Sequence, residues 1–268
     1  MKQYRIGDFA KYLGVTPDFL KHYEELGIIQ SERSESGYRF YSFRTTMMLI
    51  ECIRMRNYGM TLREIREAVS LHKVANEQFD RRINENIEHM KDEILLDEAL
   101  AAEYQNFLEW KAPLADRDSD WEIRWGSPML FLPHADRDDF IHDERIYSLI
   151  RDWMSFIPIV KSCMKMEENG QITWGFIVRE QDLLKLRIPV NDIVERIPAC
   201  KLFYYKFKGQ LVPVIDRASE LNEHPALQQM HALNLQREAT IFRTTLMPVD
   251  WQQNIGIQYG YYAVPIRT

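Results

Sequence analysis

The chain has 268 residues, 46% of them hydrophobic and 12% aromatic, and a formal net charge of -6 at pH 7. These values are typical of a folded soluble protein, and the length suits one large or two medium domains. No stretch is apolar for long enough to span a bilayer, and the N-terminus lacks the apolar core of a signal peptide. The three cysteines are widely scattered, which argues against a disulfide framework, so we expect a cytoplasmic protein.

The charge is unevenly distributed along the chain. Residues 1–72 carry 11 Lys and Arg against 9 Asp and Glu, whereas the remaining residues carry 23 against 31. A slightly basic N-terminal segment on an acidic body hints at an anionic partner such as nucleic acid.

The first predicted elements are two short helices. Apolar residues recur at helical spacing over 6–13, and Gly14 is a suitable stop. Thr16 can then cap a second helix that has Pro17 in its first position and runs to about Leu26. Two short helices joined by the tight turn "GVT" form a helix-turn-helix candidate.

A hairpin and two further helices follow. The stretches "GIIQSE" and "YRFYS" are predicted to be strands joined by a turn around Ser34–Gly37. A third helix is predicted over about 43–58, and Thr61 and Glu64 have the spacing of a capping box that starts a fourth, to about residue 70. A helix-turn-helix followed by a hairpin is a winged-helix arrangement, here in a domain over residues 1–72.

One long helix with a heptad pattern is predicted over residues 73–112. Its apolar residues step by alternating intervals of four and three, with one break at Asp97, and are Ile83, Ile87, Met90, Ile94, Ala101, Tyr104 and Leu108. This pattern is typical of a coiled coil. So long a stripe needs cover, which favours a helix from a second copy; packing on its own domain is the alternative.

Residues 113–120 form a short connector that contains Pro and Asp. Over 121–268 the pattern changes to strands, with helical stretches around 142–165 and 212–235. The order strand, helix, strand, then strand, helix, strand, strand predicts two similar α+β halves. The expected fold class is therefore α+β, with a winged helix-turn-helix, a long dimerisation helix and a two-halved C-terminal domain.

Three stretches together resemble a MerR-family transcriptional regulator. They are "YRIGDFAKYLGVTPDFLKHYEELGII", "SGYRFYS" and "ECIRMRNYGMTLREIREAV", and they cover residues 4–70 nearly without gaps. In the C-terminal part, "WGFIVRE" and "IPACKLFYYKFKG" resemble the gyrase-inhibitor-like ligand-binding domain of multidrug-sensing members. The resemblance implies a homodimer joined by an antiparallel coiled coil, which binds a palindromic promoter and distorts it for RNA polymerase when a small organic effector binds.

The resemblance also implies a set of DNA-binding residues: Thr16, Pro17, Lys21, His22, Tyr23, Tyr38, Arg39, Tyr41 and Arg44. Lys21 stands where the family usually has arginine, and His22 where it has tyrosine, which leaves the operator sequence open. In the wing, Tyr38, Arg39 and Tyr41 are expected to point outward as donors to DNA phosphate, and Phe40 is expected to face the core.

The sensing part is expected to bind a small organic molecule rather than a metal. Residues 73–128 contain no cysteine, and the histidines lack ligand spacing, so neither a metal nor another cofactor is expected. Aromatic side chains provide apolar walls and attract lipophilic cations, although a neutral aromatic effector fits equally well. The candidate effector-binding residues are Trp125, Tyr147, Trp174, Glu180, Tyr204, Tyr259 and Tyr261.

Two other functions stay open at this point. Some relatives of the C-terminal fold hydrolyse small molecules, but no nucleophile–base pair or revealing pair of carboxylates supports an enzyme here. A module that sequesters drugs without controlling transcription is the second alternative.

Overall fold

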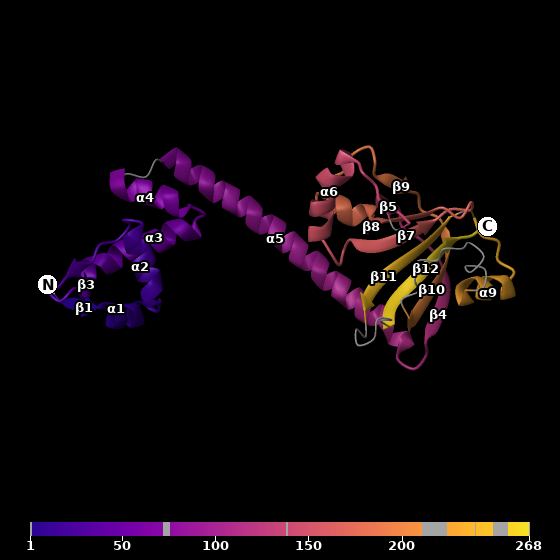
Figure 1. Cartoon of the computed structure of the whole chain (residues 1–268), viewed down its shortest axis with the longest axis horizontal. Coiled ribbons are helices and arrows are strands. Elements are labelled where there is room, and N and C mark those ends of the chain that lie inside the picture. Colours follow the sequence, from indigo (N-terminus) through magenta and orange to yellow (C-terminus); the bar gives the residue numbers. More distant parts are fainter. Residues whose placement is uncertain are drawn as a thin grey trace. The chain divides into compact units, whose positions relative to one another are not determined.

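The computed structural model describes residues 2–71, 76–137, 139–210, 224–238, 240–248 and 257–267 (Figure 1). The chain divides into two compact units, Met1–Glu93 and Ile94–Thr268. Part of the helix predicted around 212–235 lies outside the described residues. Among the helices that are described, none combines the length and the apolar character needed to cross a membrane.

The N-terminal unit is a small helical domain with a three-stranded sheet. Its elements are β1 (Gln3–Arg5), α1 (Ile6–Leu13), α2 (Pro17–Glu25), β2 (Glu32–Arg33), β3 (Arg39–Ser42), α3 (Phe43–Asn57), α4 (Leu62–Leu71) and the start of α5 (Asn76–Lys111). Strands β1 and β2 flank β3 in antiparallel pairing. The hairpin β2–β3 is the predicted wing, whereas β1 was not predicted because three residues are too few to show a strand period.

The predicted helix ends are confirmed. Gly14 closes α1 with φ +67°, in the left-handed region that favours glycine. The Thr16 hydroxyl accepts a hydrogen bond of 3.1 Å from the Phe19 amide, and Pro17 occupies the first turn of α2. These two caps fix the tight turn between α1 and α2.

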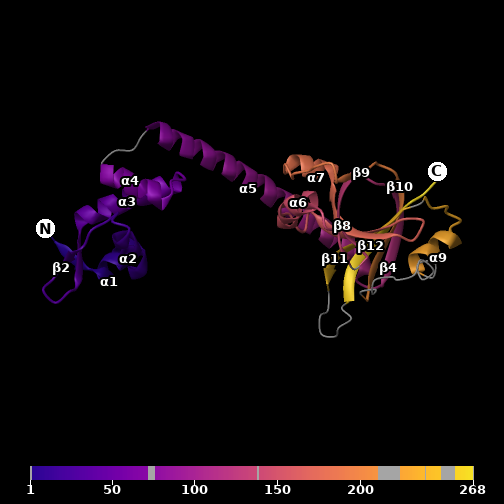
Figure 2. The same cartoon turned by 45° about the horizontal axis from the view of Figure 1, so that its top comes forward.

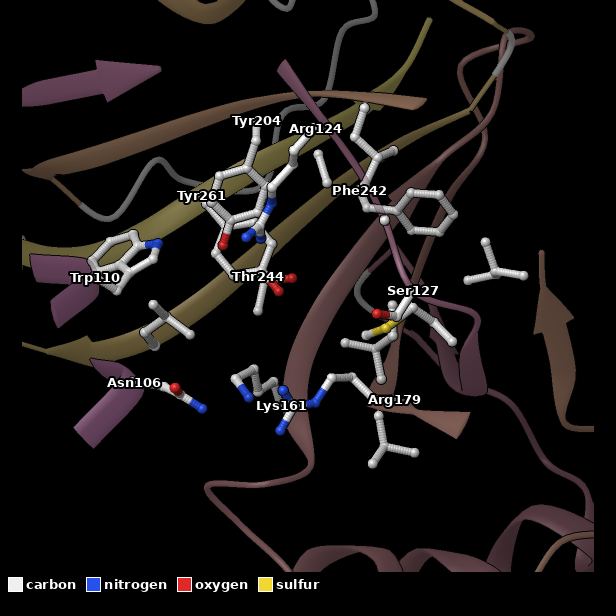
Figure 3. A pocket seen from close by; sticks show the side chains of 18 of the residues that line it. Asn106, Trp110, Arg124, Ser127, Lys161, Arg179, Tyr204, Phe242, Thr244 and Tyr261 are labelled. Carbon is white, nitrogen blue, oxygen red and sulfur yellow. The ribbon is translucent and has the colours of Figure 1, made fainter. Parts of the chain in front are cut away.

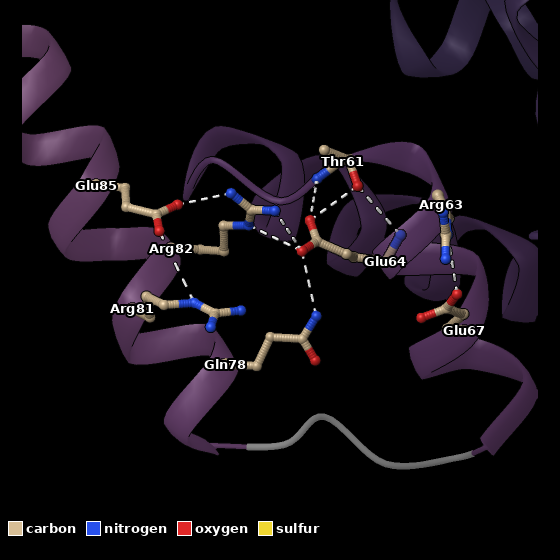
Figure 4. A network of polar contacts seen from close by, with 8 residues as sticks. All are labelled: Thr61, Arg63, Glu64, Glu67, Gln78, Arg81, Arg82 and Glu85. Atoms are coloured by element: carbon tan, nitrogen blue, oxygen red, sulfur yellow. Dashed lines mark hydrogen bonds and ion pairs between the residues drawn. The ribbon is translucent and has the colours of Figure 1, made fainter.

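Glu64 joins α4 to the first turns of α5 (Figure 4). The predicted capping box forms, because the Thr61 amide donates to Glu64 Oε2 at 2.9 Å and the Glu64 amide donates to Thr61 Oγ1 at 3.3 Å. The other carboxylate oxygen, Oε1, accepts from Arg82 Nε and Nη2 at 2.8 and 2.7 Å and from Gln78. The Arg82 hydrogen bonds lower the pKa of this buried carboxyl to about 2.

The C-terminal unit contains the rest of α5 and one large sheet. Its other elements are η1 (Ala112–Leu114), β4 (Ser119–Trp125), β5 (Met129–Asp136), β6 (Asp139–Phe140), α6 (Glu144–Ser155), β7 (Lys161–Met166), β8 (Ile172–Arg179), α7 (Glu180–Lys185), β9 (Glu195–Ile197), β10 (Lys201–Gln210), α9 (Pro225–Ala232), β11 (Ile241–Pro248) and β12 (Ile257–Pro265). Strand β4 starts at Ser119, inside the predicted connector 113–120.

The sheet confirms the prediction of two similar halves. Its strand order is β4-β10-β12-β11-β7-β8-β5-β6, and β9 also pairs with β5. Counted outward from the middle of the sheet, one half runs β7-β8-β5 and the other runs β11-β12-β10. In each half, the strand that comes second in the sequence lies at the middle of the sheet, the third lies next to it, and the first lies outermost of the three. Helices α6 and α7 lie beside the first half and α9 beside the second (Figure 2).

Helix α5 has two different faces. Leu96, Ala99 and Leu100 pack on the core beneath α6, while Phe107 and Trp110 contact Tyr259 of the sheet. The predicted heptad residues lie largely on the other face and are solvent-exposed. Ile87, Met90, Ile94, Tyr104 and Leu108 are between 43% and 58% exposed.

Candidate functional site

A cavity of about 490 Å³ lies within the C-terminal unit, between the sheet and the end of α5. Because strand side chains alternate between the two faces of a sheet, Tyr204 of β10 and Tyr261 of β12 point into the cavity, whereas their neighbours Tyr205 and Tyr262 pack in the core on the α9 side. Trp110 of α5 closes another part of the wall. The volume is in the range of small-molecule sites.

One side of the cavity is aromatic. The rings of Tyr204 and Tyr261 lie 4.4 Å apart between centroids, and the Arg124 guanidinium lies 4.0 Å over the Tyr204 ring (Figure 3). Burial raises the pKa of Tyr261 to about 12 and that of Tyr204 well above its ordinary value, so both phenols are neutral donors at neutral pH. Phe242 of β11 adds a further apolar surface.

The opposite side carries Lys161 and Arg179 (Figure 3), and Lys161 belongs to a buried ion pair. Lys161 of β7 lies 2.8 Å from Glu103 of α5, and both side chains are largely buried. Arg179 of β8 approaches the other Glu103 oxygen at 3.9 Å and also pairs with Asp182. Glu103 is thus a carboxylate on the long helix that faces the cavity and is already neutralised there.

A second group of charges is less well matched. Lys206 Nζ and Arg124 Nε each lie 3.7 Å from the same oxygen, Oε1 of Glu122. That distance exceeds the range of a hydrogen bond. The Lys206 side chain is only 12% exposed. Elsewhere in the cavity wall, the buried Trp110 indole N–H lies beside the Tyr204 hydroxyl but makes no hydrogen bond of strict geometry.

Three of the seven predicted effector-binding residues line this cavity: Trp125, Tyr204 and Tyr261. Tyr259 lies next to it and contacts the Trp110 and Phe107 rings.

The structure does not bring the other three predicted residues to the cavity. Tyr147 is exposed on α6, where its hydroxyl pairs with His142. Trp174 packs against the core under α9, and Glu180 forms an ion pair with Arg196 at 2.6 Å. Each of these side chains has a structural contact elsewhere in the domain.

The sequence reasoning missed the contribution of α5. Glu103, Phe107 and Trp110 are spaced by four and three, which is a second helical stripe beside the heptad seam. An aromatic stripe with one acid at that spacing was a detectable signal. The basic residues Arg124, Lys161, Arg179 and Lys206 had no such signal, because strand alternation alone does not tell which face is hollow.

The candidate DNA-binding surface lies on α2, the wing and α3. Lys21, which pairs with Asp18 at 2.8 Å, and His22 lie on the outward side of α2. Tyr38 is 58% exposed, with the Arg5 guanidinium 5.3 Å from its ring centroid. Arg44 is exposed at the start of α3.

The wing corrects the expectation for Tyr41 and Phe40. Tyr41 is fully buried and stacks on Phe9 with centroids 4.9 Å apart, whereas Phe40 is only half-buried. Pairing of β3 with both β1 and β2 sets this register, so Tyr41 rather than Phe40 fills the core. Tyr23 is also buried, beside Phe19, and is a core residue of α2.

Arg39 has a partner within the chain, contrary to the expectation that it donates to DNA alone. Its Nε donates to Glu24 Oε2 at 2.8 Å, and the Tyr41 hydroxyl donates to the same oxygen. Burial raises the pKa of Glu24, but the hydrogen bonds from Ser31, Arg39 and Tyr41 outweigh it and leave the pKa below its ordinary value. Arg39 therefore braces the wing against α2.

Two of the three cysteines have the properties of core residues. Cys52 and Cys163 are buried, and burial raises the pKa of their thiols to about 11 and about 12. Within the described ranges, no group of three His, Cys, Asp or Glu side chains is placed to hold a metal.

Comparison with known proteins gives matches of two kinds. The family described as "MerR HTH family regulatory protein" matches residues 4–71. The mercuric resistance operon regulatory protein of Bacillus cereus is 44% identical over 64 residues, which are 24% of this chain and 48% of that protein. The chain thus matches about half the length of such relatives. The multidrug-efflux transporter 2 regulator of Bacillus subtilis is 30% identical over 97% of this chain and 86% of its own length.

Among solved structures, the EcmrR–DNA complex in EcmrR-RPo is similar over 99% of this chain and 100% of that one. The sequence identity is 15% and the TM-score 0.36. A MerR-family regulator from Bacillus cereus covers 43% of this chain and 84% of its own, with 22% identity and a TM-score of 0.35.

Proposed function

Because the chain belongs to the MerR family of regulatory proteins, we propose that it is a dimeric transcription regulator that responds to a small organic effector. The N-terminal unit binds one half of a palindromic promoter, and the cavity of the C-terminal unit binds the effector. The bound promoter is distorted so that RNA polymerase can use it, and the protein acts in the cytoplasm.

The N-terminal unit supports the DNA-binding part of the proposal. Among the candidate contacts, the exposed residues are Thr16, Pro17, His22, Tyr38 and Arg44, and Lys21 is partly exposed. Lysine and arginine neutralise phosphates, and tyrosine and histidine add hydrogen-bond donors. Arg39 contributes by holding the wing in place, and its remaining guanidinium N–H groups stay available to phosphate.

The observation that carries the proposal is the double role of α5. One face bears the exposed heptad seam that a second copy would cover, including Tyr104 and Leu108. The other face places Glu103, Phe107 and Trp110 in the cavity wall. A molecule in the cavity therefore touches the helix that also forms the proposed dimer contact, which gives effector binding a direct path to the dimer.

Footprinting on the promoter upstream of the protein's own gene tests the proposal. We expect a protected palindrome, a dimer in solution, and an affinity that falls steeply as salt rises, since phosphate contacts release counterions. Lys21→Ala should weaken the complex, while Lys185→Ala, a lysine on α7 outside both sites, should not. Effector binding without any protected DNA would instead favour a drug-sequestering module.

A further inference from the structure

From the charges and donors that line the cavity, we propose that the effector is an aromatic anion, of the type of an aromatic carboxylate, rather than a lipophilic cation. This inference rests on the proposed function, because it assumes that the effector binds in the cavity. It assigns the aromatic ring to the wall made by Tyr204 and Tyr261, and the anionic group to Arg124 and Lys206.

Two cations that line the cavity have no hydrogen bond to a protein acceptor among the described residues. Lys206 and Arg124 carry no acceptor atoms in their side chains, and neither reaches Glu122 at hydrogen-bond distance. Trp110 offers a further donor, its indole N–H, and the Tyr204 hydroxyl is the acceptor beside it. A ligand that satisfies these groups must bring acceptors.

The two cations are close enough to hold one anionic group. Because Lys206 Nζ and Arg124 Nε both lie 3.7 Å from a single Glu122 oxygen, the two nitrogens are separated by no more than twice that distance. A carboxylate that accepts one charge-assisted hydrogen bond from each can bridge such a gap. Lys206 and Arg124 share the single carboxylate of Glu122, so this group carries one excess positive charge. A bound anionic ligand balances that charge.

The aromatic wall lies beside this anion position. Arg124 is stacked 4.0 Å over the Tyr204 ring, and Tyr261 follows at 4.4 Å. A flat ring packed on these phenols therefore has its substituent within reach of the Arg124 guanidinium. Stacking and a charged hydrogen bond then act on the same ligand, which sets both its shape and its charge.

The buried carboxylate of the cavity, Glu103, is not available to a cationic ligand. Glu103 is held by Lys161 at 2.8 Å with Arg179 nearby, and Glu122 is shared by two cations. Glu109 is exposed on α5 and accepts a hydrogen bond from Gln105. A cationic ligand bound to Glu103 would displace Lys161 and leave it buried without its partner, which is unfavourable.

A matched pair of ligands tests the proposal on the full-length protein. Naphthoate and naphthylmethylammonium share the naphthalene ring system and differ in the sign of their charge. Calorimetry measures the dissociation constant of each compound. We expect naphthoate to bind at least about tenfold more tightly. Lys206→Met and Arg124→Gln should each weaken naphthoate binding by about tenfold, while Lys206→Arg retains it and Lys185→Met, on α7, leaves it unchanged.

The outcomes separate the two proposals. Tighter binding of the ammonium compound, or binding of neither compound by a folded protein that still protects its promoter, overturns the anionic effector and leaves the regulator intact. Naphthoate binding that Lys206→Met and Arg124→Gln do not weaken also overturns it. Naphthoate binding with the expected losses, but with no promoter protected under any condition, supports the ligand class and contradicts the proposed function.

Discussion

One group of charges in the C-terminal unit is matched less closely than the ion pairs of the N-terminal unit. In the N-terminal unit, Glu64 and Arg82 meet at 2.7 Å and Glu24 and Arg39 at 2.8 Å. In the cavity of the C-terminal unit, Lys206 and Arg124 stop 3.7 Å from Glu122. Charges that are matched within the chain hold the fold, whereas charges left short of a partner are available to a ligand.

Removing the best-matched charge should have the largest effect on stability. Glu64→Gln keeps the shape of the side chain but loses the charged hydrogen bonds from Arg82, which we expect to cost about 2 kcal/mol. Hydrogen exchange of the α4 amides measures this opening free energy within the full chain. The control Glu67→Gln breaks only the exposed pair with Arg63 and should change it by less than about 0.5 kcal/mol. If both variants lowered the opening free energy of the α4 amides equally, the buried pair would be no more stabilising than the exposed one.

Acid should weaken the same contact. The pKa of Glu64 is about 2 in the folded protein against an ordinary value of 4.5, so its stabilising contribution is present above about 4.5 and is lost as the pH falls towards 2. The difference in α4 opening free energy between wild type and Glu64→Gln should therefore shrink between about pH 6 and about pH 3. A difference that stayed constant with pH would show that Arg82 does not stabilise the ionised carboxylate.

The wing pair should have an intermediate effect. Arg39→Ala removes the brace between the wing and α2 and leaves Glu24 with fewer donors, at a cost of about 1 kcal/mol in the opening free energy of β3. DNA affinity should fall by a similar factor for every operator sequence, because the wing and not a base contact is disturbed. Arg39→Lys should recover part of both losses. A change in the preferred base sequence would instead place Arg39 on a base edge.

The cavity lysine should have the smallest effect on stability. Lys206→Met removes a buried cation without a hydrogen-bonded partner, so we expect the melting temperature to stay the same or to rise slightly. Lys161→Met is the matched comparison within the same cavity. It leaves Glu103 buried without its 2.8 Å partner and should lower the melting temperature. A large loss of stability in Lys206→Met would mean that Lys206 is a structural charge like Arg82.

Local sequence signals predicted most of the fold. The caps at Gly14 and Thr16 and the box of Thr61 and Glu64 act over three or four residues, so the helix ends could be derived without tertiary information. The order of strands and helices was enough to predict two similar halves. The register of β3 could not be derived, because it depends on pairing with β1, a strand too short to detect, and this error placed Tyr41 outside the core.

The candidate site was predicted less completely, for a physical reason. Tyr204 and Tyr261 were named because aromatic side chains provide apolar walls, yet the same criterion selected Trp174, which packs on the opposite face. Which face of a sheet is hollow depends on the helices that cover it, and that is a tertiary property. The charges that define the cavity come from five different elements and converge only in the folded chain.

The pairing of two similar halves has a consequence for how the cavity can change. The carboxylate-neutralising residues Lys161 and Arg179 belong to the first half, whereas Tyr204, Lys206 and Tyr261 belong to the second. Apart from Arg124, which comes from β4, these residues of each wall thus belong to one stretch of sequence. A few substitutions in the second half can replace the group that recognises a ligand, while the first half keeps the long helix anchored through Glu103. The architecture separates the choice of ligand from the attachment of the helix that transmits its presence.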